Sequence, residues 1–510
     1  MRQKVVTSAV AMLALVVVIV AGLTAGPSLF DGGKSRGSEP AVTDPDPGTP
    51  VVLVILDELP TGSLMRPDGT IDQHRFPVFA KLASQSTWYR DHVAAGDFTA
   101  WAVPPILTGN HVNQEILPTD AVQPDNIFNL LGPGRRVHSL EEVTELCPKR
   151  ICPDGHQGEH PEERFADDFI KAKFKLVEVG EINRWIKGMP AGRRTLSVIH
   201  LPLPHAPHRF LPNGKLYPGG PLGFTIPKYR NDWTIPDAGI TLVQQRHLLQ
   251  AGFADLMLGR ILKKIRKNGS WDESMVIVTA DHGHAFDARY DRRDAAPPTV
   301  AATVNPPLMI KYPGQKAGFV STRSTQAIDI VPTIAEQLGV KDLYPTDGLP
   351  IDRVPADRVM MVNKDEMAEI QVTADQVREQ RPEYIRESRR RFGGGGLWRL
   401  STHPQLLDRR VGKRPAAPGD ATIDSPERYV KVRPRADRVP SFVTGTTTGV
   451  PLDTTLAVAV NGRIAATGRN FPYEGADRFG VMVKPSYFRP GRNRIAVYTV
   501  SPDDRLRRLR

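Results

Sequence analysis

The sequence predicts an α/β fold: a mostly parallel central sheet flanked by helices, followed by a small C-terminal β-rich module. Short β-branched apolar runs at residues 51–56 and 275–280 suit strands buried on both faces of a parallel sheet. The second run follows an amphipathic helix expected over residues 241–267, which is the alternation of helix and strand that such a sheet requires. After about Tyr429 the pattern changes to short alternating runs, and Asn461-Gly462 is typical of a hairpin turn between two of them.

The 510 residues leave room for one large domain and a smaller one. A stretch rich in Gly, Pro, Ser and Asp precedes the first strand and has the composition of a tether. The expected organisation is an N-terminal anchor or signal at 1–30, a linker at 31–49, the main α/β domain at 50–355, a helical or irregular connector at 356–428, and a small β-sandwich-like module at 429–510.

The N-terminus carries a long uncharged apolar stretch behind the basic Met1-Arg2-Gln3-Lys4. Its densest part, residues 5–23, is long enough to span a bilayer, and the positive flank predicts a cytoplasmic N-terminus with the rest of the chain outside. Small residues at 21–25 leave a cleaved signal peptide open instead. We therefore expect a single-pass protein of the cell membrane with an extracytoplasmic main domain, or a secreted protein.

The composition and net charge indicate which classes of binding partner to expect. The hydrophobic content of 40% suits a globular core, and the net charge of +11 favours anionic partners such as phosphate- or sulfate-bearing substrates or an acidic membrane surface. The basic residues are scattered, and neither a zinc-finger spacing nor an aromatic RNA-binding motif occurs, so no nucleic-acid partner is expected. The two cysteines, Cys147 and Cys152, could close a small disulfide loop, which export permits.

Acidic and histidine side chains follow two of the expected strands. Asp57 and Glu58 end the first apolar run, and Asp281 and His282 end the later one. Ligands of open α/β sheets bind beyond the carboxyl ends of the strands, so these groups stand where a metal site is expected. The structural alternative is that they are ordinary turn residues, because Asp, His and Gly are common in turns.

Two other stretches offer reactive groups. Thr99 stands on a small-residue turn before an apolar helical segment, where it could be a helix N-cap or a nucleophile at a helix N-terminus. A strand expected at 195–199 leads into His200, His205 and His208, which lie among prolines. Because proline breaks helices, we expect these histidines to line a rigid loop at the strand's end.

Taken together, these motifs resemble the sulfatase branch of the alkaline phosphatase superfamily over about residues 51–339. The resemblance rests on their order: a strand ending in Asp, a nucleophile turn followed by Leu-Thr-Gly, Pro-His-x-Pro, a strand ending in Asp-His-Gly, and Asp-Ile-Val-Pro-Thr. It implies an alkaline-phosphatase-like layered α/β fold and a sulfatase-like catalytic domain over 50–355.

The resemblance also implies residue roles. Asp57 looks like the first metal-ligand acid, and Asp281 with His282 looks like the second ligand pair. Thr99 looks like the nucleophile, because it stands ten residues before Gly109, as the sulfatase Cys or Ser stands before its own Leu-Thr-Gly.

The remaining site residues are assigned less directly. His205, in Pro204-His205-Ala206-Pro207, looks like the histidine that contacts substrate or protonates the leaving group. Glu58, His208 and His284 are further candidates for the site.

One departure from the sulfatase pattern bears on substrate. A sulfatase reads Cys-x-Pro-Ser-Arg at the nucleophile, whereas this chain has Thr99, Trp101, Ala102 and Val103 at the corresponding positions. Thr cannot become formylglycine, and a Thr nucleophile is similar to that of phosphoglycerol and phosphoethanolamine transferases. We expect a hydrolase or transferase acting on phosphate esters, with phosphodiesters or phospholipid head groups as substrates.

Two alternatives remain at this stage: a sulfuric ester hydrolase, and a non-catalytic protein that binds envelope polymer on a degenerate enzyme scaffold. For the enzyme we expect one divalent metal ion held by Asp57, Thr99, Asp281 and His282. Carboxylates with one imidazole suit Mn²⁺, with Mg²⁺, Ca²⁺ and Zn²⁺ as competitors. Expected partners are an anionic ester, lipid or envelope polymer, and the membrane itself through the N-terminal helix.

Overall fold

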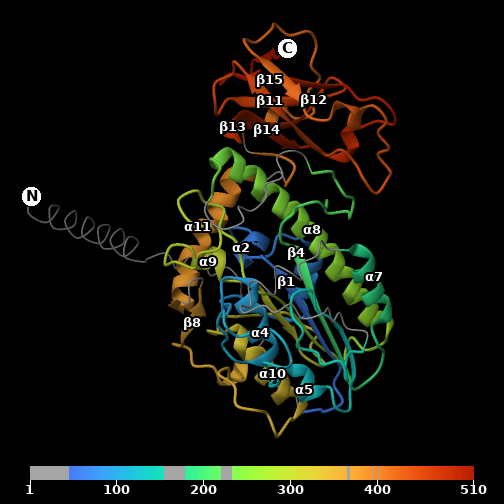
Figure 1. The fold of residues 1–510 in the computed structure, drawn as a ribbon, viewed down its shortest axis with the longest axis vertical. Coiled ribbons are helices and arrows are strands. Elements are labelled where there is room, and N and C mark those ends of the chain that lie inside the picture. Colours follow the sequence, from blue (N-terminus) through green and yellow to red (C-terminus); the bar gives the residue numbers. More distant parts are fainter. Residues whose placement is uncertain (1–44, 154–177, 220–232, 365–367, 394–395, 401) are drawn as a thin grey trace, which may run out of the picture.

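The computed structural model describes residues 45–153, 178–219, 233–364, 368–393, 396–400 and 402–510. An α/β domain fills the lower part of Figure 1, and a separate β module, drawn in red, lies above it. The anchor or signal expected at 1–30 falls outside the described residues. Within them, no helix combines the length and apolar character needed to cross a membrane.

A seven-stranded sheet forms the centre of the α/β domain, and the mostly parallel arrangement predicted from the apolar runs is confirmed. Strand β1 lies between β4 and β5 and is parallel to both. The parallel pairing continues from β4 to β3, whereas β6 pairs antiparallel with β5. In sheet order the strands are β3 (Arg136–Leu140), β4 (Thr195–Pro204), β1 (Val51–Asp57), β5 (Met275–Ala280), β6 (Leu308–Lys311), β2 (Thr87–Tyr89) and β7 (Phe319–Ser321).

Helices cover both faces of this sheet, because alternate side chains of β1 point to opposite sides. Val52, Val54 and Leu56 belong to one buried cluster, which α8 and α7 complete, while Val51, Leu53 and Ile55 belong to another, which α4 and α10 complete. The helices of the domain are α2 (Thr61–Leu64), α3 (Pro77–Ala83), α4 (Thr99–Thr108), α5 (Ile127–Leu131), α7 (Val179–Gly188), α8 (Asp237–Lys267), α9 (Val300–Thr303), α10 (Ile330–Leu338) and α11 (Ala374–Phe392).

Much of the segment expected as a connector belongs to the α/β domain in the structure. A hairpin of β8 (Val359–Asn363) and β9 (Glu369–Thr373) leads into α11, which packs against α2 and α9. The Thr373 side chain accepts a hydrogen bond from the Gln376 amide and so caps that helix. Arg381 of α11 forms a buried ion pair with Asp91 of the main domain.

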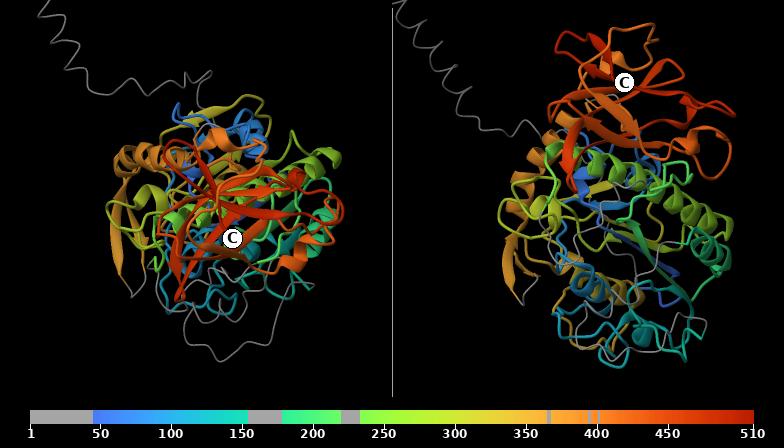
Figure 2. Two further views of the ribbon diagram at one scale, coloured as in Figure 1. Left: turned by 90° about the horizontal axis from the view of Figure 1, so that it is seen from above. Right: turned by 45° about the horizontal axis from the view of Figure 1, so that its top comes forward.

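The C-terminal module is a seven-stranded antiparallel sheet with apolar clusters of its own. Its first strand starts at Asp420, earlier than the boundary expected at Tyr429, and the Asn461-Gly462 turn joins β12 to β13 as predicted. The right-hand view in Figure 2 shows the module at one end of the α/β domain, where β13 and β14 contact α8. Its strands, in sheet order, are β10 (Asp420–Ile423), β11 (Phe442–Thr448), β14 (Ala476–Met482), β13 (Arg463–Tyr473), β12 (Thr455–Val460), β15 (Ile495–Val500) and β16 (Leu506–Arg508).

A disulfide joins Cys147 to Cys152, the pair that the sequence left able to close. Both cysteines are buried in the apolar cluster on the α4 and α10 face of the sheet. The bond therefore fixes a loop of the α/β domain.

Candidate active site

The centre of the candidate site lies where strands β1, β4 and β5 run side by side. Asp57 is the last residue of β1, Asp281 directly follows β5, and His200 lies within β4. Each of the three offers one ligand atom, and these atoms all lie within 4.8 Å of one another. The structure thus brings together two acids that the sequence predicted and a histidine that it placed elsewhere.

Polar atoms at this centre are buried without a partner among the described residues. They are both oxygens of Asp57, Oδ2 of Asp281 and both ring nitrogens of His200. Burial, reinforced by the charges of Asp281 and Glu58, raises the pKa of Asp57 well above its ordinary value, and burial raises that of Asp281 to about 7. Two adjacent buried carboxylates repel each other when both are ionised. This set of donors therefore fits a divalent cation, which would neutralise both charges and accept the lone pairs that no hydrogen bond uses.

The second ligand pair is oriented by its own backbone. Asp281 Oδ1 accepts hydrogen bonds from the amides of His282 (2.6 Å) and Glu58 (3.1 Å), which leaves Oδ2 facing the centre. His282 Nδ1 donates to the carbonyl of Gly283 at 2.8 Å. Its Nε2, 3.5 Å from Asp281 Oδ2, therefore carries the lone pair, and burial lowers the pKa of this imidazole to about 3 and keeps it neutral.

Thr99 is the first residue of α4, and its hydroxyl points at the ligand pair. Oγ1 lies 3.4 Å from His282 Nε2, and only 4% of the residue is exposed. Phe98 occupies the N-cap position and makes no side-chain capping bond, so Thr99 is not the helix cap that the structural alternative required. The amides at the start of α4 add a favourable environment for an anion beside this hydroxyl.

Glu58, a candidate ligand from the sequence, instead pairs with a cation. Its Oε1 accepts a hydrogen bond from Arg293 Nε at 2.6 Å, and its backbone has the uncommon φ of 61°. Burial alone would raise the pKa of Glu58, but the charge of Arg293 holds it well below its ordinary value. Glu58 is therefore an ionised anchor for Arg293.

His205 joins the same network. Arg293 Nη2 donates to His205 Nε2 at 2.6 Å, and the ring's Nδ1 bonds to the carbonyl of Ala206. Burial lowers the pKa of His205 to about 4, so the imidazole is neutral and accepts at Nε2. Both ring nitrogens are thus engaged within the protein, and the neutral ring offers no free acidic proton for a leaving group, which was one of the two roles implied by the resemblance.

His208 and His284 lie apart from the metal-type centre. Their rings are buried with that of His247 from α8, at centroid distances of 5.7 Å between His208 and His247 and 6.1 Å between His247 and His284. His284 also stacks on Phe286 at 4.4 Å. The structure therefore places these two predicted residues in an aromatic cluster behind the site.

The sequence interpretation missed two residues of the candidate site. His200 was expected in a loop, but β4 continues to Pro204, and the parallel pairing of β4 with β1 sets His200 opposite Ile55. Arg293 lies in an irregular segment eleven residues after His282, where no periodic pattern marks it. The one available signal was the pair Arg292-Arg293 in a loop that follows a candidate ligand pair.

Comparison with known proteins identifies the family of one segment of the chain. Residues 179–340 match the family model described as Sulfatase. This segment is a sulfatase-family domain. It contains the Pro-His-x-Pro, Asp-His-Gly and Asp-Ile-Val-Pro-Thr motifs, and the predicted resemblance is confirmed there. Asp57 and Thr99 lie before the matched segment, and it is the fold that brings them to it.

Curated relatives match over shorter stretches. The chain is 32% identical over 96 residues to the multifunctional alkaline phosphatase superfamily protein PehA of Trinickia caryophylli, covering 18% of each chain. It is 33% identical over 86 residues to arylsulfatase K of Danio rerio, covering 17% of this chain and 16% of that one. The matches thus span less than a fifth of either relative.

A similar solved structure is the phosphonate monoester hydrolase SpPMH from Silicibacter pomeroyi. It is 18% identical, with a TM-score of 0.45, and the likeness covers 62% of this chain and 80% of that one.

Proposed function

We propose that the protein is an exported, membrane-anchored metal-dependent enzyme that cleaves phosphate esters through a covalent phospho-threonine on Thr99. One observation carries the proposal: the Thr99 hydroxyl is buried beside His282, at a centre where both oxygens of Asp57 and Oδ2 of Asp281 lack hydrogen-bond partners among the described residues. An alcohol held in this way becomes a usable nucleophile when a cation occupies the adjacent ligands.

The ion would be held by Asp57, Asp281, His282 and the Thr99 hydroxyl, and His200 offers a further imidazole. Oxygen-rich ligands with imidazole suit Mn²⁺, with Mg²⁺, Ca²⁺ and Zn²⁺ as competitors. When bound, such an ion lowers the pKa of the alcohol and offsets charge on the phosphoryl oxygens.

Thr99 and Arg293 have different roles in the proposed phosphoryl transfer. Thr99 Oγ1 forms a bond to phosphorus while the bond from phosphorus to the leaving oxygen breaks. Arg293, fixed by Glu58 and directed at His205, supplies hydrogen bonds to the non-bridging oxygens, where the negative charge is held. The phosphoryl group is then transferred from Thr99 to water in a hydrolase or to a second alcohol in a transferase: the acceptor oxygen bonds to phosphorus, the bond from phosphorus to Oγ1 breaks, and the acceptor's proton returns to the Thr99 hydroxyl.

Phosphate is preferred to sulfate because Thr99 cannot be converted to formylglycine. The family model and the arylsulfatase K match favour a second candidate, a sulfuric ester hydrolase. A non-catalytic envelope-binding protein is a third, and metal content separates it from both, because an intact centre should copurify with about one divalent ion per chain.

The setting of the enzyme is part of the proposal. The apolar N-terminal stretch supports a membrane anchor or an export signal, and the Cys147–Cys152 disulfide is typical of exported proteins. An anionic ester with a lipid or envelope-polymer body would then meet the site outside the cytoplasm.

A substrate panel tests the proposal. Aryl phosphomonoesters, phosphodiesters and sulfates, together with phospholipid head-group donors, are offered to the full chain with Mn²⁺, in parallel with the Thr99→Ala variant. We expect turnover of phosphate esters that Thr99→Ala abolishes. Turnover of sulfates alone would refute the phosphoryl preference and favour the second candidate.

A further inference from the structure

A cavity lies beside the loop that carries His205, on the side facing the C-terminal module. Its volume is about 290 Å³. Residues from the loop, from α8 and from the segment that enters the module line it together. The lining residues are Val179, Pro202, His205, Ala206, Pro207, Arg209, Phe210, Leu216, Gln250 and Arg438.

Two arginines give this cavity its charge. Arg209 comes from the α/β domain and Arg438 from the segment leading into the module, and neither guanidinium makes a hydrogen bond or ion pair with a residue in the described part of the chain. The described lining contains no carboxylate. Two cations at one cavity without an acidic partner attract an anion, and the guanidinium fork suits carboxylate, phosphate or sulfate.

Apart from His205 and Gln250, the rest of the lining is apolar. Phe210 stacks on Phe253 with 4.5 Å between ring centroids, which makes one wall rigid, and Val179 and Leu216 extend the apolar surface. A dry cavity of about 150 Å³ is enough to admit benzene, so this one has room for a ring and an attached anionic group. We propose that the cavity is an anion-binding site for a small amphipathic molecule, with one aromatic or short aliphatic body and one acidic group held by Arg209 and Arg438.

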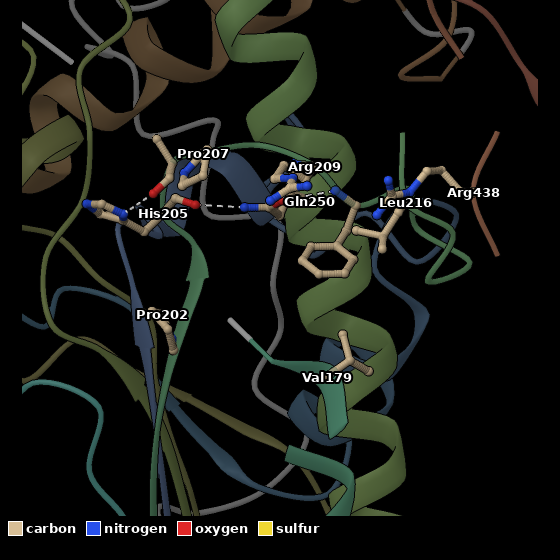
Figure 3. A pocket seen from close by; sticks show the side chains of 10 residues that line it. Val179, Pro202, His205, Pro207, Arg209, Leu216, Gln250 and Arg438 are labelled. Atoms are coloured by element: carbon tan, nitrogen blue, oxygen red, sulfur yellow. Dashed lines mark hydrogen bonds between the residues drawn. The ribbon is translucent and has the colours of Figure 1, made fainter. Parts of the chain in front are cut away.

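This site is distinct from the reactive centre. Figure 3 shows the His205 imidazole pointing away from Arg209 and Arg438, so the loop stands between the cavity and the network of Arg293 and Glu58. The two are nevertheless joined through Gln250 of α8. Its Oε1 accepts from the Arg209 amide at 2.8 Å, and its Nε2 donates to the His205 carbonyl at 2.7 Å.

Hydrogen bonds also fix the wall of the cavity that carries Arg438. The Leu216 amide donates to the Asp437 carbonyl at 2.7 Å, and the Val439 amide donates to the Leu216 carbonyl at 2.9 Å. These bonds fix the segment that presents Arg438 against the α/β domain. Because both arginines are placed by backbone hydrogen bonds, the cavity is preformed and its ligand would not have to assemble it.

Binding of 4-fluorobenzoate to the full-length protein with Mg²⁺ present, followed by ¹⁹F NMR, tests the site. We expect measurable binding at neutral pH and at least about tenfold weaker binding in the Arg209→Gln/Arg438→Gln double variant, because each charged hydrogen bond lost is worth about a factor of ten. The neutral probe 4-fluorobenzyl alcohol should bind about tenfold more weakly than the acid.

Two controls make the result specific. Arg433→Gln/Arg435→Gln removes the same charge from exposed positions of the same segment and should leave the affinity within about twofold. Asp57→Asn alters the reactive centre and should also leave the affinity for 4-fluorobenzoate within about twofold. The outcome therefore does not depend on the proposed function. Equal affinity in the Arg209/Arg438 variant, or loss of binding in Asp57→Asn, would overturn the proposal.

Discussion

A buried polar cluster of the central parallel sheet and a buried asparagine of the C-terminal antiparallel sheet differ in whether their hydrogen bonds are made. At the meeting point of β1, β4 and β5, both oxygens of Asp57, Oδ2 of Asp281 and both ring nitrogens of His200 are buried without hydrogen-bond partners among the described residues. In the module, the fully buried Asn470 accepts from the Thr454 amide at 2.8 Å and donates to Thr447 at 3.1 Å.

This difference indicates which region of the molecule holds the candidate active site. A buried polar group left without a partner costs free energy, so a cluster of them persists only where something else completes it. A buried group whose hydrogen bonds are all made is a structural element. The cluster on the parallel sheet is therefore the candidate reactive site, whereas Asn470 stabilises the module.

The largest expected effect is at the nucleophile. Thr99→Ala should lower kcat on a phosphate ester by three orders of magnitude or more, which is roughly the cost of removing a nucleophile from a catalytic unit. Thr99→Ser should retain part of the activity because it keeps the hydroxyl. Steady-state kinetics and thermal unfolding of both variants check this, and an active Thr99→Ala protein would remove Thr99 from the mechanism.

Arg293 is the next strongest test. Arg293→Gln should lower kcat/KM by about 10²- to 10³-fold, because it removes donors to the phosphoryl oxygens and leaves Glu58 buried without its cation. Arg289→Gln is the matched control, since Arg289 is an exposed arginine of the same segment that pairs with Asp287. If both variants lost activity equally, the segment as a whole would be responsible.

Without metal, the stability of the folded protein should depend on pH, because Asp57 and Asp281 repel each other when both are ionised. Folded-state pKa values of Asp57 and Asp281 are raised above their ordinary values, so between about pH 4 and 7 the metal-free folded protein binds more protons than the unfolded chain. Its stability should therefore fall as pH rises through this window.

Thermal unfolding of the full chain across that window, with EDTA and with Mn²⁺, measures the effect. We expect the midpoint with EDTA to fall with rising pH and Mn²⁺ to restore it at the upper end, where the acids are ionised. If the unfolding midpoint were the same with EDTA and with Mn²⁺ across the whole pH window, a metal centre formed by Asp57 and Asp281 would be contradicted.

The smallest effect on catalysis is expected in the module. Asn470→Ala should lower the free energy of unfolding by about 1–3 kcal/mol, because it leaves its buried partners without hydrogen bonds, and it should leave kcat within about twofold. Denaturant titration and kinetics on one preparation give both values. A large loss of kcat with a stable fold would assign the module a part in the reaction.

The same contrast explains how far the sequence could be interpreted. Asp57 and Asp281 were found because each directly follows an apolar run, and strand ends of a parallel sheet meet at one edge. Thr99 was found through its distance from Gly109. These are local signals that survive in a single sequence.

The residues that were missed depend on longer-range structure. His200 required the true length of β4, and the prolines near it favoured ending the strand too early. Arg293 lies in an irregular segment, so only the fold brings it to Glu58 and His205. The module's first strand, β10, has four residues and is recognised through its pairing with β11.

The most direct test of the account is to trap the intermediate. The full-length protein with Mn²⁺ is mixed with a turned-over phosphate ester, quenched in acid during steady state, digested and analysed by mass spectrometry. The account predicts a phosphoryl group on the peptide that contains Thr99, assigned to that residue by fragmentation and absent when metal is removed. Sustained turnover with an unmodified Thr99 peptide, or with the phosphoryl group on another residue, would contradict it.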